Sequence, residues 1–461
     1  MLNKLCIICI FLVSCGGGNS SSSNNDFASV TNLPAVPSVV CSLKFSSEYP
    51  EIYIGPHQIP VPESVLSSQV VQRSISFKDY YGGNSFEFTG EKNTLGEATW
   101  NGCTQDEFNK KIYTQTLMRM KDAGANLAWI YNYAPWIDDQ ADNLQISVPD
   151  YQISDQMIEW IVREANGMGI EIYFAWQFWG IDKEQDVIYE MGSTPDLSIL
   201  KKIMDAHELN IVNQAVMARA AGITGIAADW NAMSICFCGE NSDELKEYYI
   251  KRISVTIDKI KEIFPGKVLI GQIGSVLNDK RIFSKVDGLY LSITGNHIMK
   301  VSSEENINLS PDVIRLAALE YFEYEYKKMY CEDLQPCWPG TSYKKIPVMV
   351  NFSSQSKSDY WVNGWTEDGF CTAGALKDGT AVECIQDYLT TDFSAQAVGM
   401  EGMLQAIAEQ TYFDISGVDI HTGYWLTETL LPGREGFPNL SQSIRGKPAE
   451  KIVKYWYSGL Q

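Results

Sequence analysis

Acidic and amide side chains recur in this 461-residue chain at the points where apolar, strand-like runs end. The run 223–230 closes on Asp229, which shares with Asn231 the parity that places alternate strand residues on one face. Because burial disfavours a charged carboxyl group, a carboxylate at the end of an apolar strand is costly unless it has a function. We therefore predict that Asp229 acts as a nucleophile or base. A structural acid paired with a cation such as Lys78 is the alternative.

A carboxylate of this kind needs a proton donor, and three residues elsewhere in the chain are candidates. They are His297, Asp419 and Glu367. An acid and a base on opposite sides of a glycosidic bond can cleave it through an oxocarbenium-like transition state. The two groups would lie about 5 to 5.5 Å apart in a retaining enzyme and about 6.5 to 9.5 Å apart in an inverting one. For the histidine, a structural role is the alternative.

The same strand ends carry residues suited to binding a sugar. Amides and acids suit hydroxyl groups, and aromatic rings stack on the apolar C–H faces of sugar rings. Aromatic residues make up 12% of the chain, with 12 Trp and 24 Tyr, although any single Trp can equally belong to the core. The candidates are Lys78, Tyr131, Asn132, Trp176, Gln177, Trp179, Trp230, Asn231, Gln272, Asn351, His421 and Trp425. We expect a polysaccharide or oligosaccharide in an open cleft at these strand ends.

Eight strand-like runs alternate with helical ones along the chain. The strand-like runs are 73–79, 126–132, 170–177, 223–230, 267–272, 288–294, 346–351 and 417–421. The alternation is typical of a parallel sheet with crossover helices. It predicts an α/β fold, a single (β/α)8 TIM barrel with loop insertions, whose strand ends carry the reacting groups. A doubly wound sheet is the alternative, but neither a GxGxxG nor a P-loop motif follows the first run.

The helical runs have recognisable starts and stops. They span 104–123, 152–167, 197–221, 243–263, 310–330, 392–411 and 447–457, with a short, weak one between the fifth and sixth strands. Thr104 and Glu107 have the spacing of a capping box, and the helix that they start ends near Gly124. Ser310 and Pro311 form an N-cap followed by proline at the first helical position.

The N-terminus predicts export and a lipid anchor. A positive start and a nine-residue apolar core precede Leu12-Val13-Ser14-Cys15, which resembles the lipobox of bacterial lipoproteins. The apolar core is too short to span a bilayer, which takes about 20 helical residues. We expect a signal peptide over 1–14, a lipidated Cys15 with a flexible tether over 15–45, and the barrel domain over 46–461. An ordinary secretory signal is the alternative. The expected location is the cell envelope, with the N-terminal lipid as the only membrane contact.

Cysteine usage agrees with export. Cys6 and Cys9 would leave with the signal and Cys15 would carry lipid, which leaves eight of the 11 cysteines. An even number in an exported protein indicates disulfides, and Cys331 with Cys337 and Cys371 with Cys384 are close enough in sequence to clip loops. The pairing cannot be deduced from sequence. Cys236 and Cys238 have no second metal-ligand pair, so we expect neither a metal nor a cofactor.

The formal net charge of −21 disfavours nucleic acid and anionic bilayers as partners, because both need basic patches. A neutral sugar is the simplest ligand for such a surface. We expect a monomer.

The C-terminal stretch 443–457 resembles the closing helix of glycoside hydrolase family 113, the TIM-barrel β-mannanases of clan A. The stretches 391–397 and 417–425 resemble the family's last helix and strand. The resemblance covers about the last 70 residues and implies a barrel that cleaves polysaccharides. Enzymes of this clan carry a glutamate acid/base after strand four and a glutamate nucleophile at the end of strand seven. Here those ends carry Asp229 and Asn351, so neither glutamate carries over.

Three functions follow from these patterns. The first is a glycosidase with relocated chemistry, centred on Asp229; an Asp on strand four resembles the nucleophile of several α-glycoside-cleaving barrels, and a histidine donor resembles some fucan-degrading enzymes. The second is a non-catalytic glycan-binding lipoprotein. The third is another exported barrel enzyme, such as a deacetylase or a lyase. We favour the glycosidase because Asp229 and Asp419 have no purpose in an inactive cleft.

Overall fold

The computed structural model describes the barrel strands and most of the helices around them. The described residues are 41–42, 54–62, 64–78, 102–134, 136–138, 145–147, 153–178, 197–228, 242–273, 279–293, 309–330, 346–357, 360–363, 376–377, 380–381, 392–426 and 441–458. All of them belong to the unit Val40–Gln461, whereas the unit Met1–Val39 lies outside the described residues. The predicted signal peptide and Cys15 therefore remain predictions.

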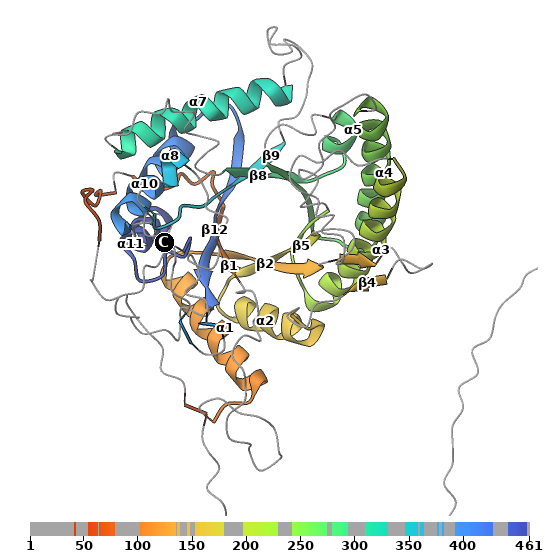
Figure 1. Cartoon of the computed structure of the whole chain (residues 1–461), viewed down its shortest axis with the longest axis horizontal. Helices are drawn as coiled ribbons and strands as arrows, with labels where there is room; N and C mark the ends of the chain where they lie inside the picture. The colour runs from red at the N-terminus through yellow and green to blue at the C-terminus, as the bar shows by residue number, and fades with distance from the viewer. Residues whose placement is uncertain are drawn as a thin grey trace, which may run out of the picture. The chain divides into compact units, whose positions relative to one another are not determined.

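Eight parallel strands close into a barrel, with the first strand paired to the last (Figure 1). In order around the ring, they are β1 (Gln72–Lys78), β12 (Asp414–Trp425), β9 (Pro347–Phe352), β8 (Gly288–Ile293), β7 (Lys267–Ile273), β6 (Gly225–Ala227), β5 (Glu171–Phe178) and β2 (Leu127–Ala134). Each corresponds to one of the eight predicted strands. The predicted (β/α)8 barrel is confirmed, and the doubly wound sheet is excluded because the sheet closes.

The helices surround the strands, as Figure 1 shows. They are α1 (Gln105–Asp122), α2 (Asp155–Gly167), α3 (Leu197–Ala221), α4 (Ser242–Ile263), α5 (Lys280–Phe283), α7 (Pro311–Tyr330), α8 (Tyr360–Asn363), α10 (Phe393–Glu409) and α11 (Pro448–Ser458). The short helix expected between the fifth and sixth strands is α5. Two hairpins were not predicted, one of β3 (Trp136–Asp138) with β4 (Gln145–Ser147) and one of β10 (Leu376–Lys377) with β11 (Thr380–Ala381).

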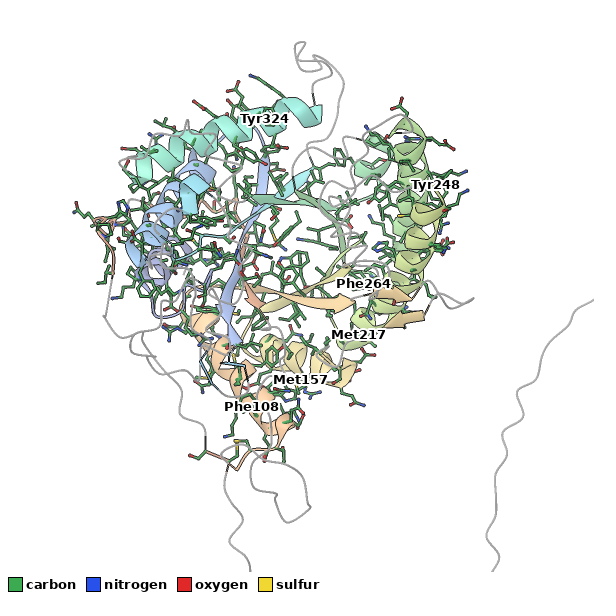
Figure 2. The ribbon with its side chains drawn as sticks, viewed as in Figure 1. Phe108, Met157, Met217, Tyr248, Phe264 and Tyr324 are labelled. Carbon is green, nitrogen blue, oxygen red and sulfur yellow. A yellow bond between two sulfur atoms is a disulfide. The ribbon has the colours of Figure 1, made fainter. Side chains whose placement is uncertain are left out.

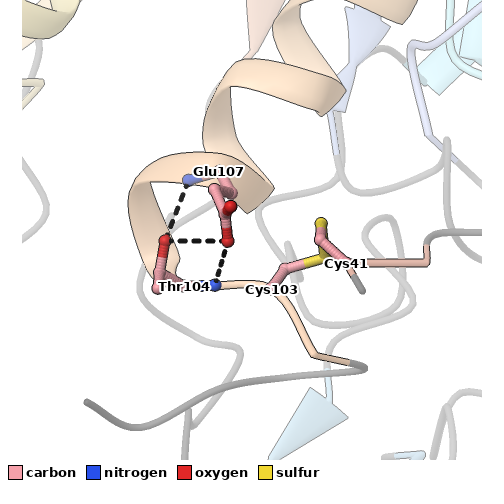
Figure 3. Close-up of a disulfide and its surroundings, with 4 residues drawn as sticks. All are labelled: Cys41, Cys103, Thr104 and Glu107. Atoms are coloured by element: carbon pink, nitrogen blue, oxygen red, sulfur yellow. Dashed lines mark hydrogen bonds between the residues drawn. A yellow bond between two sulfur atoms is a disulfide. The ribbon is translucent and has the colours of Figure 1, made fainter. Parts of the chain in front are cut away.

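The predicted helix caps are present. The Glu107 backbone N–H donates to Thr104 Oγ1 at 3.3 Å, and the Thr104 N–H donates to Glu107 Oε2 at 3.0 Å (Figure 3). The Val313 N–H donates to Ser310 Oγ at 3.3 Å at the start of α7. Gly124, after α1, has φ +85°, and a Cβ there would lie 2.9 Å from the Cβ of Tyr457. Glycine is therefore required for both its conformation and its close contact with α11.

Two hydrophobic cores result from the alternation of side chains along the strands. The larger core lies between strands and helices and includes Phe108 and Phe264, both labelled in Figure 2. The smaller one fills the inside of the barrel, which we call the lumen. Its members are Leu127, Trp129, Tyr131, Tyr173, Ala175, Ala227, Leu269, Tyr290 and Met349. Barrel interiors are usually dominated by branched aliphatic residues, so four aromatic side chains here indicate a lumen with another purpose.

One disulfide joins Cys41 to Cys103, across 62 residues of sequence (Figure 3). Cys103 directly precedes the N-cap of α1, so the bond attaches the N-terminal segment to that helix. The expectation of disulfides is thus confirmed by a pair that spacing had not indicated. Cys331, Cys337, Cys371 and Cys384 lie outside the described residues. Within the described part of the chain, no helix combines the length and apolar composition that a membrane span requires.

Candidate functional site

Polar side chains from four neighbouring strands meet in the lumen. The strand register pairs Asp419 of β12 with Ser74 of β1 on one side and with Asn351 of β9 on the other. Asn351 in turn pairs with Ser292 of β8. Because paired residues of parallel strands share a face, these four side chains all point inward.

The carboxylate of Asp419 is the centre of this arrangement. Ser74 Oγ donates to its Oδ1 at 2.6 Å, while Tyr290 OH and Asn351 Nδ2 donate to its Oδ2 at 2.6 and 2.7 Å. The residue is completely buried. The Asn351 side chain is itself fixed by a hydrogen bond, since its Oδ1 accepts from Ser292 Oγ at 2.8 Å. The Asp419 site is therefore a rigid, fully buried group of hydrogen bonds.

Burial raises the pKa of Asp419 above its usual value, against the hydrogen bonds from Ser74, Tyr290 and Asn351, which lower it. The described donors to Asp419 are neutral, so desolvation prevails. Burial also raises the pKa of Tyr290, with the charge of Asp419 adding to the effect. A carboxyl group with a raised pKa at the inner face of a barrel is typical of a functional site.

A line of polar atoms continues from Asp419 to His421. The hydroxyls of Tyr290 and Tyr131 lie 2.8 Å apart, and the Tyr131 hydroxyl is also 3.5 Å from Asp419 Oδ2. Nδ1 of His421 lies 3.4 Å from the Tyr131 hydroxyl, and the two rings meet edge to face with centroids 5.3 Å apart. Tyr131 is 5% exposed, whereas His421 is partly exposed. We call Ser74, Tyr131, Tyr290, Ser292, Asn351, Asp419 and His421 the Asp419 network.

An irregularity in β12 begins at His421. The register with β1 passes from the pair Ile75–Ile420 to the pair Phe77–Tyr424, so three residues of β12 oppose one of β1. Thr422 within this bulge has φ 48°, which costs a β-branched residue about 1–3 kcal/mol. Its N–H donates to Ser76 Oγ at 2.7 Å, and its hydroxyl donates to Gln442 Oε1. Backbone strain that is held in this way is characteristic of functional sites.

The end of strand seven, β9, carries an amide and a hydroxyl in place of a glutamate. Asn351 belongs to the Asp419 network, and Ser353 Oγ accepts from Gln442 Nε2 at 2.9 Å. Tyr360 OH donates to the Ser353 carbonyl oxygen at 2.9 Å. Ser353 is 3% exposed, so this strand end is buried and fixed by polar contacts.

The end of strand four, β6, is fixed by contacts with the neighbouring strand β7 and with helix α3. The Ala228 N–H donates to the Leu269 carbonyl oxygen at 2.7 Å, and His207 Nε2 of α3 lies 2.8 Å from the Ala228 carbonyl oxygen. Ala228 is completely buried. These contacts fix the backbone immediately before Asp229 in the chain, and Asp229 itself lies outside the described residues.

The predicted site residues fall into three groups. Four of them meet in the Asp419 network: Tyr131, Asn351, Asp419 and His421. Six lie in the predicted strands, with their side chains outside the described part: Lys78, Asn132, Trp176, Gln177, Gln272 and Trp425. The others lie outside the described residues altogether: Trp179, Asp229, Trp230, Asn231, His297 and Glu367.

Sequence reasoning missed three members of the network, Ser74, Tyr290 and Ser292. The signal was present, because Tyr290 and Ser292 alternate with Leu289 and Leu291 along one strand. Such alternation places the polar residues on the inner face once the leucines are assigned to the outer core. Within the described residues, no group of three or more His, Cys, Asp or Glu side chains could hold a metal ion.

The fold is a (β/α)8 barrel with a polar group of side chains in its lumen, and solved structures share this fold. Two solved structures of GH113 β-1,4-mannanases, one of them a complex, each align with a TM-score of 0.52 at 10% sequence identity. Each alignment covers 86% of this chain and 100% of the mannanase. The GH113 β-mannanase AaManA from Alicyclobacillus acidocaldarius aligns over 85% of this chain and 98% of its own, at 13% identity and a TM-score of 0.49.

The resemblance to glycoside hydrolase family 113 is thus confirmed at the level of the fold, and it extends over most of the chain. No protein-family model matches the sequence. No curated protein matches it either.

Proposed function

We propose that this protein is a glycoside hydrolase that cleaves a polysaccharide or oligosaccharide at the carboxyl ends of its barrel strands. The observation that carries the proposal is the Asp419 network, in which a buried carboxyl group, two tyrosines and a partly exposed histidine replace aliphatic packing on a glycosidase-type barrel. Buried polar groups are costly, and a barrel needs none of them for closure. Acids, amides and aromatic rings together suit a sugar substrate.

Asp229 is the proposed nucleophile or base, because it follows the fixed end of strand four. Asp419 is completely buried and held by three donors, so within the proposal it positions its neighbours rather than meeting the substrate. The proton donor then comes from His297, Glu367 or the network itself. The remaining strand-end residues of the sequence prediction, from Lys78 to Trp425, are proposed to bind the sugar.

Export and anchoring through Cys15 are part of the same proposal. The Cys41–Cys103 disulfide supports export, because disulfides persist mainly in oxidising compartments. Growth of cells with an alkynyl fatty acid tests the anchor. Label on the parent chain and none on a Cys15→Ser variant is expected, whereas equal label on both would contradict lipidation at this residue.

A glycan-binding protein without catalysis is the second candidate. It is favoured by the ends of strands four and seven, neither of which carries the glutamate of clan A. At strand seven, the amide and hydroxyl groups that stand there are already engaged in hydrogen bonds. Such a protein would bind the same sugars and release none.

Sugar release from a panel of plant and algal polysaccharides tests the proposal. Mannan comes first, because the aligned structures are β-1,4-mannanases, and fucans follow. Purified parent, an Asp229→Asn variant and an Asp243→Asn control on the outer surface of α4 are compared by reducing-end assay. Loss of at least about 100-fold in the first variant only is expected. Binding without release by the parent would favour the second candidate, and full activity of Asp229→Asn would remove that residue from the mechanism.

A further inference from the structure

We propose that His421 is the catalytic acid/base of this barrel, with Tyr131, Tyr290 and Asp419 as positioning residues behind it. The inference rests on the proposed glycosidase function and deepens it by naming the proton donor. It assigns His421 a different role from the sugar-binding one that the sequence indicated.

The position of His421 in the barrel is the first support. The chain has four histidines, and three of them are described: His57, His207 and His421. His57 lies beside Asp392 at the start of α10, and His207 is buried on α3 against the Ala228 carbonyl. Of the described histidines, His421 is the one that lies in a barrel strand, on its inner face and near its carboxyl end. Reacting groups of (β/α)8 enzymes come from these strand ends.

Exposure distinguishes His421 from the residues behind it. Asp419 and Tyr290 are completely buried and Tyr131 is 5% exposed, whereas the imidazole is partly exposed. A proton donor must be accessible to the substrate, and His421 is the one member of the described network that is not buried. His421 is the first residue of β12 after the regular pairing with β1, and it begins the bulge that contains Thr422.

The Tyr131 hydroxyl can follow the imidazole through both of its protonation states. A hydroxyl rotates, so it accepts a hydrogen bond from Nδ1–H of an imidazolium and donates one to Nδ1 of a neutral ring. The contact between Tyr131 and Tyr290 allows either hydroxyl to be the donor. The Tyr290 hydroxyl donates to Asp419 Oδ2. The carboxylate therefore stabilises a positive charge on His421 through the two tyrosine hydroxyls. Nε2, on the opposite side of the ring from Nδ1, is the nitrogen that would exchange the proton with the substrate.

The chemical step is a proton transfer that accompanies cleavage. The imidazolium gives its Nε2 proton to the glycosidic oxygen as the bond from the anomeric carbon to that oxygen breaks, and the bonding electron pair stays on the oxygen. Water supplies hydroxide to the anomeric carbon, and the remaining proton of that water returns to the imidazole, directly or through Asp229 and solvent. The net change is addition of one water across the glycosidic bond.

Dependence on the leaving group tests the role of His421. A leaving group that departs without protonation does not need the acid, so an aryl oligosaccharide of the cleaved sugar, with dinitrophenolate as leaving group, is compared with the natural polysaccharide. His421→Gln should reduce kcat on the polysaccharide by about 100-fold or more and leave cleavage of the aryl substrate within about threefold. Tyr131→Phe should show the same pattern at a smaller size, because it acts through the histidine.

Matched variants separate this role from simple loss of structure. His57→Gln makes the same change at a histidine outside the Asp419 network, and Tyr173→Phe removes another lumen hydroxyl, one that contacts Gln72 rather than Asp419. Both controls should keep the activity of the parent on both substrates. Folding of each variant is followed by thermal denaturation, so that rates refer to folded protein.

Two results would overturn the proposal, and they differ from failure of the proposed function. If His421→Gln loses the same factor on both substrates, or loses nothing on the polysaccharide, then His421 is not the proton donor although the protein is a glycosidase. If the parent itself releases no sugar from any substrate, both the glycosidase and its acid are wrong. Selective loss on the polysaccharide supports His421.

Discussion

The strand β12 has polar side chains on both of its faces. Each face lies against an acidic residue, and the two acids differ in the charge of their partners. On the inner face, Asp419 accepts hydrogen bonds from the neutral groups of Ser74, Tyr290 and Asn351. On the outer face, Tyr424 donates to Glu450, which Arg119 of α1 contacts with two nitrogens at 2.5 and 2.6 Å. The outer acid has a cation, whereas the described partners of the inner acid are neutral.

Under the proposed function, this difference separates a structural acid from a functional one. Arg119, Tyr424, Arg445, Gly446 and Glu450 form what we call the Glu450 cluster, which ties α1, β12 and α11 together. Its bidentate ion pair fixes geometry and compensates charge. The described side chains that donate to Asp419 are uncharged, and burial raises the pKa of Asp419. We propose that the first arrangement serves stability and that the second prepares a proton relay.

Removing the acid of the Glu450 cluster should produce the largest loss of stability. Glu450→Gln leaves the guanidinium of Arg119 without its charge partner, and loss of one member of a buried pair costs about 3–5 kcal/mol. Chemical denaturation should show this loss in the free energy of unfolding, at the lower end because both side chains retain some exposure. Sugar release per folded molecule should be unchanged. A large drop in kcat would instead place the cluster in the active machinery.

Removing the Cys41–Cys103 disulfide should have the next largest effect. The bond closes a loop of 62 residues, and such bonds stabilise by about 2–4 kcal/mol. A Cys41→Ser, Cys103→Ser double variant should therefore melt several degrees below the parent, with its lumen and activity intact. A melting temperature equal to that of the parent under oxidising conditions would show that the bond adds nothing to stability.

Two of the three lumen tyrosines, Tyr131 and Tyr173, allow a comparison with a smaller expected effect. Tyr131→Phe and Tyr173→Phe each remove a buried hydroxyl, at a cost of about 1 kcal/mol in unfolding free energy. Only Tyr131→Phe should also lower kcat, by about tenfold, because it disconnects His421 from Asp419. Equal kcat in the two variants would contradict the relay while leaving the packing of the lumen as described.

The buried carboxyl group on the inner face should make the free energy of unfolding depend on pH, with a small effect of predictable sign. Because the pKa of Asp419 is raised in the native state above its unfolded value of about 4, the native state keeps the proton longer as pH rises. Its contribution to stability is complete below the unfolded pKa and is lost as pH rises through the native one.

An Asp419→Asn variant lacks this titration. Its unfolding free energy relative to the parent should therefore rise with pH from about 4 upward and level off once Asp419 is ionised in the native parent. Urea titrations at several pH values check the sign, with Asp243→Asn as the exposed control. A difference that is constant with pH would contradict the raised pKa.

Much of this fold could be predicted from the sequence. Strands are short apolar runs between turn signals, and the caps at Thr104 and Ser310 are local chemistry, so both were visible in the pattern. The full length of β12 could not be predicted, because a β-branched Thr422 gives no sign of the left-handed backbone that it adopts. The Cys41–Cys103 pair depends on how the N-terminal segment meets α1, which sequence spacing does not determine.

The candidate site was predictable only in part. Alternation placed Asp419 and His421 on one face of a strand, and both contact the Tyr131 hydroxyl there. The partners of Asp419 depend on the stagger between strands, which brings Ser74 and Asn351 level with it. That stagger is a property of the closed barrel and leaves no mark in any single run of sequence.

The catalytic rate of Asp419→Asn tests most directly the claim that the inner face of β12 serves activity. The substitution keeps the volume of the side chain and removes its charge, and folded protein is quantified by thermal denaturation. We predict that kcat on the cleaved polysaccharide falls at least about tenfold while the variant stays as well folded as the parent. An Asp419→Asn protein that releases sugar at the parental rate would contradict the claim and make the Asp419 network a structural feature of the barrel.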